Sequence, residues 1–102
     1  MSKPDLIEIR LKLPSDVAET LSNKEIIGAL CDKSFTKAEY YQSKCNEYRE
    51  KYKTTFASFR KKVNSSKEEH FQEWDDLLIW EGCELAMRDW KKKYAELKKR
   101  LA

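Results

Sequence analysis

The stretch WEGCELAMRDWKKKYAELKKRL, residues 80–101, decides the fold class of this chain. Its apolar residues recur at alternating spacings of three and four positions, which places them along one face of an α-helix. They are Trp80, Cys83, Met87, Trp90, Tyr94, Leu97 and Leu101. This seam spans three heptads and predicts a long amphipathic helix that packs against a neighbour. Gly82 within it leaves room for a neighbouring backbone, or marks a kink.

The long helix is expected to begin near residue 66, because two pairs fit the capping box that opens helices. Ser65 pairs with Glu68 in one register, and Ser66 pairs with Glu69 in the other. We therefore assign residues 66–101 to a single amphipathic helix for partner binding. A second apolar stripe on an adjacent face consists of Phe71, Trp74, Leu78 and Leu85.

The middle of the chain, residues 15–63, is also predicted to be helical. One face carries apolar residues at helical spacing: Ala38, Tyr41, Cys45, Tyr48 and Tyr52. Ser22 or Asn23 is the candidate cap at the start of this helix. Ser34 and Thr36 are candidate caps or interruptions within it.

A break in the helix is expected at Thr54 and Thr55, after the last residue of that apolar face. Thr55 can cap a short helix, since threonine is a favoured N-cap residue. This short helix carries Phe56, Phe59 and Val63 on one side.

One β-strand is predicted at residues 6–13, LIEIRLKL. The apolar residues alternate with charged ones, which is typical of a strand with one buried face. The apolar set is Ile7, Ile9, Leu11 and Leu13, and the charged set is Glu8, Arg10 and Lys12. Pro14 ends the alternation, and Ser15 and Asp16 can cap a short helix after it. The predicted fold is a mainly α single domain of residues 1–102, with one N-terminal β-strand, several helices and a long C-terminal amphipathic helix.

A single strand in a helical chain needs a partner for its backbone N–H and C=O groups. No second segment of this sequence alternates convincingly, so the strand pairs with its copy, pairs with another protein, or stays flexible until it binds. In a ribbon–helix–helix dimer, two such strands would direct Glu8, Arg10 and Lys12 into the DNA major groove. The competing interpretation is an amphipathic strand whose charges are solvated.

The composition excludes several classes of protein. Only 2 Gly and 2 Pro among 102 residues argue against a turn-rich β fold and against a Gly-rich phosphate loop. A net charge of +3 is too mild to indicate nucleic-acid binding by itself. No apolar run is long enough to predict a membrane span.

The cysteines predict a reducing compartment. Cys31, Cys45 and Cys83 are odd in number, widely spaced and without a C-x-x-C motif. The N-terminus also lacks the apolar core of a signal peptide. We therefore expect reduced, partly buried thiols in a cytoplasmic protein.

Charge is segregated along the chain. Residues 68–84 hold seven acids and no Lys or Arg, whereas residues 88–102 hold seven bases and two acids. Residues 44–62 are again basic, with seven bases and two acids. Acids early and bases late in the last helix suit its macrodipole, and they also suit a partner surface recognised by charge.

No catalytic or metal-binding constellation is visible, so we expect a protein that is not an enzyme and needs no cofactor. His70 is the only histidine, so any Ser–His–Asp or Cys–His arrangement hinges on this one residue. A metal site there would need further ligands from Asp75 or Asp76, which are adjacent on a helix and therefore not on one face. The neighbouring acids are expected to form a solvated face rather than an acid–base pair. They are Glu68, Glu69, Glu73, Asp75 and Asp76.

The aromatic residues of the last helix divide between the core of this chain and a partner groove. Trp and Tyr are the residues that most often anchor protein interfaces. The candidate partner-binding residues are Trp74, Trp80, Glu81, Trp90 and Tyr94.

Two stretches carry a family resemblance: KYKTTFASFRKKV at residues 51–63 and EWDDLLIWE at residues 73–81. Together with the opening strand, they resemble small antitoxin-like proteins of prokaryotic, often archaeal, type II toxin–antitoxin pairs. In that family a helix ends at a Lys-Tyr-Gly-type turn, a Phe-x-x-Phe helix follows, and an acidic helix carries a Trp-Glu pair. Lys53 stands where relatives usually have Gly, so the preceding helix is expected to run further here.

The resemblance implies an antitoxin that binds and blocks a cognate, ribonuclease-like toxin, as a homodimer or a hetero-oligomer. It also implies binding to operator DNA through the N-terminal strand. The acidic stretch of residues 68–84 is then a candidate cover for a basic active site of the toxin. Two alternatives remain: a ribbon–helix–helix DNA-binding regulator, and a helical-bundle or coiled-coil adaptor that self-associates through residues 80–101.

Overall fold

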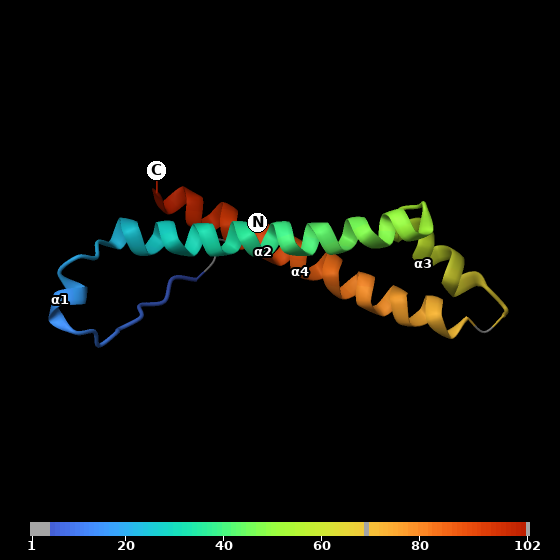
Figure 1. Cartoon of the computed structure of the whole chain (residues 1–102), viewed down its shortest axis with the longest axis horizontal. Coiled ribbons are helices and arrows are strands. Elements are labelled where there is room, and N and C mark those ends of the chain that lie inside the picture. Colours follow the sequence, from blue (N-terminus) through green and yellow to red (C-terminus); the bar gives the residue numbers. More distant parts are fainter. Residues whose placement is uncertain (1–4, 69, 102) are drawn as a thin grey trace.

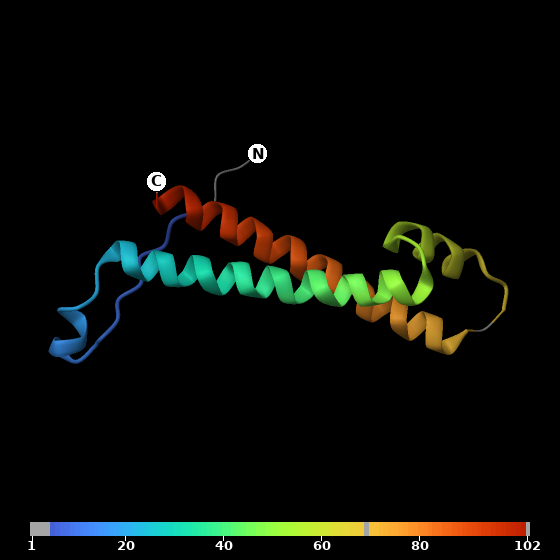
Figure 2. The same ribbon diagram turned by 45° about the horizontal axis from the view of Figure 1, so that its top comes forward.

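Two long helices packed side by side in opposite directions make up most of this computed structural model, which describes residues 5–68 and 70–101 (Figure 1). The helices in chain order are α1 (Ser15–Ala18), α2 (Asn23–Tyr52), α3 (Phe56–Ser65) and α4 (Phe71–Leu101). α2 and α4 form the hairpin, and α3 connects them at one end, as both views show (Figures 1 and 2). The prediction of a mainly helical chain is confirmed. None of the helices in the described ranges is both long enough and apolar enough to cross a bilayer.

The start of α2 agrees with the sequence prediction, but its interior does not. Ser22 has extended backbone, and its side chain accepts a hydrogen bond of 3.1 Å from the Glu25 backbone N–H. The predicted interruption at Ser34 and Thr36 is wrong, because α2 continues through both residues. Ser34 is buried on the face that packs toward α4, along with other small residues of this helix. The buried residues of α2 are Cys31, Ser34, Ala38 and Cys45. Their small side chains let the two helices approach closely.

The turn between α2 and α3 begins at Lys53. The expectation that α2 runs further is wrong, because Lys53 takes φ 54° and ψ 38°, the left-handed conformation that ends a helix. Lysine thus adopts the backbone conformation that glycine favours at this position. Thr55 then caps α3 as predicted, accepting a hydrogen bond of 3.2 Å from the Ser58 N–H.

Replacing Lys53 with glycine is expected to raise the free energy of unfolding by about 1 kcal/mol, because it removes the clash of Cβ in the left-handed region. Lys53→Ala is the matched control: it also removes the exposed ion pair to Glu50 but keeps Cβ. Urea unfolding followed by circular dichroism measures both. If alanine stabilises as much as glycine does, the backbone explanation is wrong.

α4 begins later than the capping-box pattern predicts. Its first described residue is Phe71, and the Trp74 N–H donates to the His70 carbonyl at 2.9 Å. Ser66 instead closes α3: its N–H donates to the Val63 carbonyl, and its hydroxyl accepts from the Glu68 N–H. Ser66 therefore ends one helix rather than starting the next. The alternative cap partner, Glu69, lies outside the described residues.

The hydrophobic core lies where α2, α3 and α4 meet. Its buried members are Cys45, Phe59, Val63, Leu77 and Trp80, and the partly buried side chains around them are Tyr48, Tyr52, Phe56, Cys83 and Met87. Ring centroids of Tyr48 and Phe59 lie 5.8 and 5.4 Å from that of Trp80. Every residue of the predicted seam is buried or half-buried. The periodic spacing therefore identified the packed face of α4 correctly.

The predicted strand at residues 6–13 is wrong for this chain, since no β-strand occurs among the described residues. Residues 5–14 run as an extended segment that lies beside the first turns of α2 and leads to α1 (Figures 1 and 2). A strand needs a second strand to bond with, and the rest of the described chain is committed to helices and short connections. Apolar and charged side chains alternate along this segment, but the backbone hydrogen bonds between strands that normally accompany such alternation are not formed among the described residues.

Candidate protein-binding surfaces

The N-terminal segment, residues 5–14, exposes its apolar side chains instead of burying them. Ile7 and Ile9 are 84% and 81% exposed, and Leu11 is 69% exposed. Within the described ranges, residues 5–13 take part in no backbone hydrogen bond. The segment therefore presents apolar side chains and unpaired backbone groups together. This is the combination that a sheet edge in another protein can satisfy by adding a strand.

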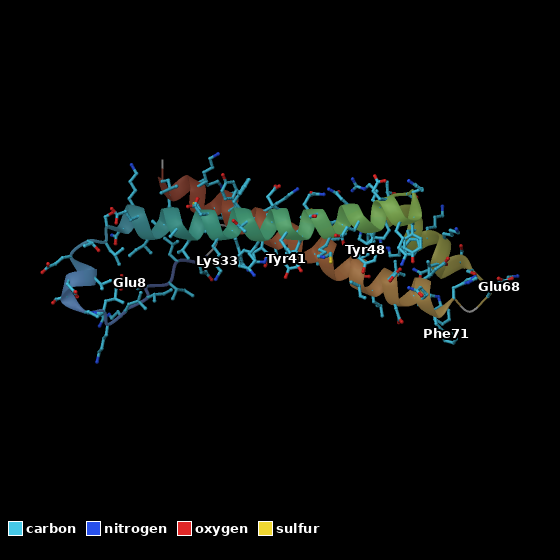
Figure 3. All side chains as sticks on the ribbon, in the orientation of Figure 1. Glu8, Lys33, Tyr41, Tyr48, Glu68 and Phe71 are labelled. Atoms are coloured by element: carbon cyan, nitrogen blue, oxygen red, sulfur yellow. The ribbon has the colours of Figure 1, made fainter. Side chains whose placement is uncertain are left out.

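The residues predicted to touch DNA lie on the same segment. Glu8, Arg10 and Lys12 are exposed, and Figure 3 shows Glu8 near the start of α2. They do not form a two-stranded ribbon within one chain, because residues 5–68 and 70–101 contain no second strand. The helix that follows, α1, has only four residues. A shallow hollow of about 510 Å³ lies between the segment and the start of α2. Its apolar lining includes Ile7, Ile9 and Ile26.

The predicted solvated acidic face is only partly present. Asp76 is buried, and one of its oxygens accepts from Lys51 Nζ at 2.6 Å and from the Tyr52 hydroxyl. Glu84, which is not among the residues predicted for this face but belongs to the acidic stretch 68–84, is also buried, and its Oε2 lies 3.9 Å from Arg88 Nη2. Asp76 therefore joins the end of α2 to the start of α4 and is not available to a partner.

The titration of this cluster follows from its contacts. Burial alone would raise the pKa of Asp76, but hydrogen bonds from Lys51 and Tyr52 outweigh it, and the net pKa lies below the usual value. Burial, followed by the hydrogen bond to Asp76, raises the pKa of Tyr52. The carboxylate is thus held charged and the phenol neutral, which suits a structural contact.

The five predicted partner-binding residues have different surroundings. Trp80 is 0% exposed and belongs to the core of this chain, because three helices close around it. Tyr94 is half-buried against the Phe35 ring, at 5.6 Å between centroids. Glu81 and Trp90 are half-buried, and Trp74 is 38% exposed. Trp74 is the most exposed aromatic residue among the five, and Trp90 keeps a half-buried surface.

The exposed apolar face of α4, which we call the outer face, was only partly identified from sequence. Its members are Phe71, Trp74, Leu78, Ile79 and Leu85. Leu78 is 70% exposed and Leu85 57%, although both are large apolar side chains on a well-formed helix. Phe71 and Trp74 touch edge to face, with centroids 5.5 Å apart. In Figure 3, Phe71 points away from α2. Sequence analysis missed Ile79, which falls between the two predicted stripes.

A groove of about 530 Å³ lies between the first half of α2 and the last half of α4. Leu30, Trp90 and Leu97 give it an apolar floor. Charged residues surround this floor: Lys33, Asp89, Lys92, Lys93 and Glu96. The Lys93 ammonium lies over the Trp90 ring at 4.5 Å from its centroid and also 2.6 Å from Asp89. The groove is therefore an apolar slot with a mainly basic rim.

Two of the three cysteines, Cys45 and Cys83, lie in surroundings that disfavour the thiolate. Burial and the carboxylate of Glu84 raise the pKa of Cys45 to about 12, and burial also raises the pKa of Cys83. Both thiols are therefore protonated near neutral pH and are poor nucleophiles. All three cysteines are free, and no cluster of metal-ligating side chains occurs among the described residues.

Comparison with protein-family models, with curated proteins and with solved structures finds no match to this chain.

Proposed function

We propose that this chain is an antitoxin: a non-catalytic protein that binds and blocks a cognate, ribonuclease-like protein toxin in the cytoplasm. The observation that carries the proposal is the extended segment of residues 6–13. Its apolar side chains are exposed, and its backbone forms no hydrogen bond with other backbone groups of the described residues, although the helices fold around a packed core. The free cysteines agree with a reducing compartment.

The mode of binding follows from the geometry of the segment. An extended backbone adds to the edge of a sheet, and its alternate side chains enter pockets on one face. Ile7, Ile9 and Leu11 would fill those pockets, and Glu8, Arg10 and Lys12 would remain in solvent. A helical hairpin cannot supply the sheet, so the sheet belongs to the toxin. The family resemblance of residues 51–63 and 73–81, together with the opening segment, adds the expectation that this partner is a toxin.

A ribbon–helix–helix DNA-binding regulator is the second candidate, favoured by the exposure of Arg10 and Lys12 on an extended segment. It requires two copies of the segment to pair with each other. The same charged side chains would then carry binding to operator DNA, and the apolar side chains would carry dimerisation.

Growth rescue tests the antitoxin proposal. The protein encoded by the adjacent reading frame is expressed alone and together with this chain, and growth and copurification are followed. We expect growth arrest that this chain relieves. The triple variant Ile7→Ser, Ile9→Ser, Leu11→Ser should bind at least roughly a hundredfold more weakly, since each buried apolar side chain contributes about 1 kcal/mol or more.

The matched control changes the other face of the same segment: Glu8→Gln, Arg10→Gln and Lys12→Gln. It should rescue growth as the wild type does. No arrest and no complex would overturn the antitoxin proposal. Operator binding that the control abolishes would favour the DNA-binding regulator instead. Rescue by the triple serine variant would retain the antitoxin and exclude the segment as its binding site.

A further inference from the structure

Gly82 lies at the centre of the outer face of α4. On a helix, the neighbours of a residue lie three and four positions away, and those of Gly82 are Leu78, Ile79, Leu85 and Ala86. Glycine is the least favourable residue of a helix interior apart from proline. Apart from its two chain neighbours and the backbone of its own helical turns, no atom of the described chain lies within 4 Å of where its Cβ would be, so packing inside this chain does not require glycine.

The result is a hole with apolar walls and a glycine floor. Leu78, Ile79 and Leu85 are 70%, 53% and 57% exposed, so the walls are open to solvent. A helix that crosses at Gly82 could approach closely and place its side chains between these walls, as in knobs-into-holes packing. The shape of the outer face therefore fits a helix as its occupant.

Charge complementarity indicates that the helix that occupies the outer face is α4 of a second copy of this chain. Residues 68–84 hold seven acids and no Lys or Arg, and residues 88–102 hold seven bases and two acids. In an antiparallel pair centred on Gly82, residues 71–81 of one copy, with four acids and no Lys or Arg, lie beside residues 83–93 of the other, with four bases and two acids. A parallel pair would oppose like charges along its whole length.

The register of an antiparallel pair centred on Gly82 is also complementary in size. Each residue before Gly82 faces the residue the same number of positions after it in the other copy. Leu78 then faces Ala86, a large side chain against a small one, and Ile79 faces Leu85. At the centre, glycine faces glycine, which allows the two backbones to approach closely.

The same register brings the exposed aromatic pair to the groove. Phe71 and Trp74 face Lys93 and Trp90 of the second copy, which line the groove between α2 and α4. Two aromatic side chains would thus meet an apolar floor with a basic rim. Asp75 faces Asp89, which is a like-charge pair, and the Lys93 ammonium 2.6 Å from the Asp89 carboxylate offsets it.

We propose that this chain forms a two-fold symmetric dimer through its outer face, with α4 packed antiparallel on α4 of a second copy and crossing it at Gly82. The interface is isologous, so each copy contributes both an aromatic pair and a groove. This dimer goes beyond the antitoxin proposal, because it leaves residues 6–13 free and does not depend on a toxin.

Sedimentation equilibrium of the isolated full chain tests the dimer with two glycine variants. Gly82→Leu fills the hole and is expected to weaken the dimer at least roughly tenfold in dissociation constant. Gly28→Leu is the matched control, because Gly28 is also within a helix and also has open space at its Cβ position. The control should remain as dimeric as the wild type. Thermal unfolding of both variants by circular dichroism shows that each is folded.

Disulfide trapping tests the orientation. In an antiparallel crossing at Gly82, Gly82→Cys places the two new thiols close to the symmetry axis, and mild oxidation should join the copies. Leu85→Cys faces Ile79 instead and should not join them. A parallel dimer would trap both variants, which would overturn the proposal.

Three outcomes of the sedimentation experiment would also overturn it. They are a monomeric wild type, a Gly82→Leu variant that dimerises as the wild type does, and a dimer lost in the triple variant Ile7→Ser, Ile9→Ser, Leu11→Ser. The last outcome would show that the N-terminal segments pair with each other. A wild-type dimer that is lost only in Gly82→Leu supports the proposal whether or not the neighbouring protein is a toxin.

Discussion

Replacing Trp80 with alanine is expected to lower the free energy of unfolding by about 3–5 kcal/mol, which is a large part of the stability of a domain this size. Trp80 is completely buried, and its ring lies within 5.8 Å of the rings of Tyr48, Phe56 and Phe59, measured between centroids. Alanine leaves a cavity where all three helices meet, and it removes the aromatic contacts together with the buried area. Urea unfolding followed by tyrosine fluorescence and far-ultraviolet circular dichroism measures the loss.

Trp80→Phe is the control that separates ring packing from the indole N–H. This N–H is buried and has no hydrogen-bond partner among the described residues. Phenylalanine keeps an aromatic ring in the core and removes a donor that is costly to leave unpaired. Its loss of stability should therefore be much smaller than that of alanine. Equal losses for the two variants would contradict this account of the core.

Removing the carboxylate of Asp76 is expected to cost about 1–3 kcal/mol of stability at neutral pH. Asp76→Ala takes the buried acceptor from both Lys51 and Tyr52, and it disconnects the end of α2 from the start of α4. Asp75→Ala is the matched control, since Asp75 is the adjacent acid but is exposed. An exposed acid of this kind should change stability by no more than about 0.5 kcal/mol.

The pH dependence of the same variants carries a definite sign. The pKa of Asp76 is lowered in the folded chain, so its contribution is fully present above the ordinary value of 3.8. The contribution is lost as the pH falls from 3.8 through the lower pKa of the folded state. The difference in stability between the wild type and Asp76→Ala should therefore shrink over this acidic range. A constant difference would show that the carboxylate contributes by packing rather than by charge.

The sequence predicted the helices whose signals are local and periodic. The spacing from Trp80 to Leu101 identified the packed face of α4, and Thr55 identified the start of α3, because each depends on residues within a few turns. The predicted strand at residues 6–13 failed for a different reason. Alternation describes one strand, but a ladder needs a second one, and no local pattern reports whether a second one is present.

The functional surface was predictable only in part. Asp75 and Asp76 are identical in type and adjacent in sequence, yet one is exposed and the other buried beneath Lys51. Asp76 lies four residues before Trp80 and so continues the packed face of α4, a local signal that the sequence prediction did not use. The contacts of Asp76 with Lys51 and Tyr52 at the end of α2 depend on the tertiary structure. The stripe of Phe71, Trp74 and Leu78 was visible as a pattern, but its exposure depends on which side of α4 the hairpin occupies.

The unequal ends of the hairpin give the chain a gradient of local stability. The aromatic core around Trp80 and Phe59 holds the closed end, where α3 joins the two long helices. At the other end, α2 contributes small buried residues such as Cys31 and Ser34, and the facing Trp90 and Leu97 are only half-buried. Local unfolding costs least where the fewest apolar contacts must be broken. We therefore expect α2 and α4 to separate first where α2 begins and α4 ends. This local unfolding would occur near the N-terminal segment while the end that contains α3 stays folded.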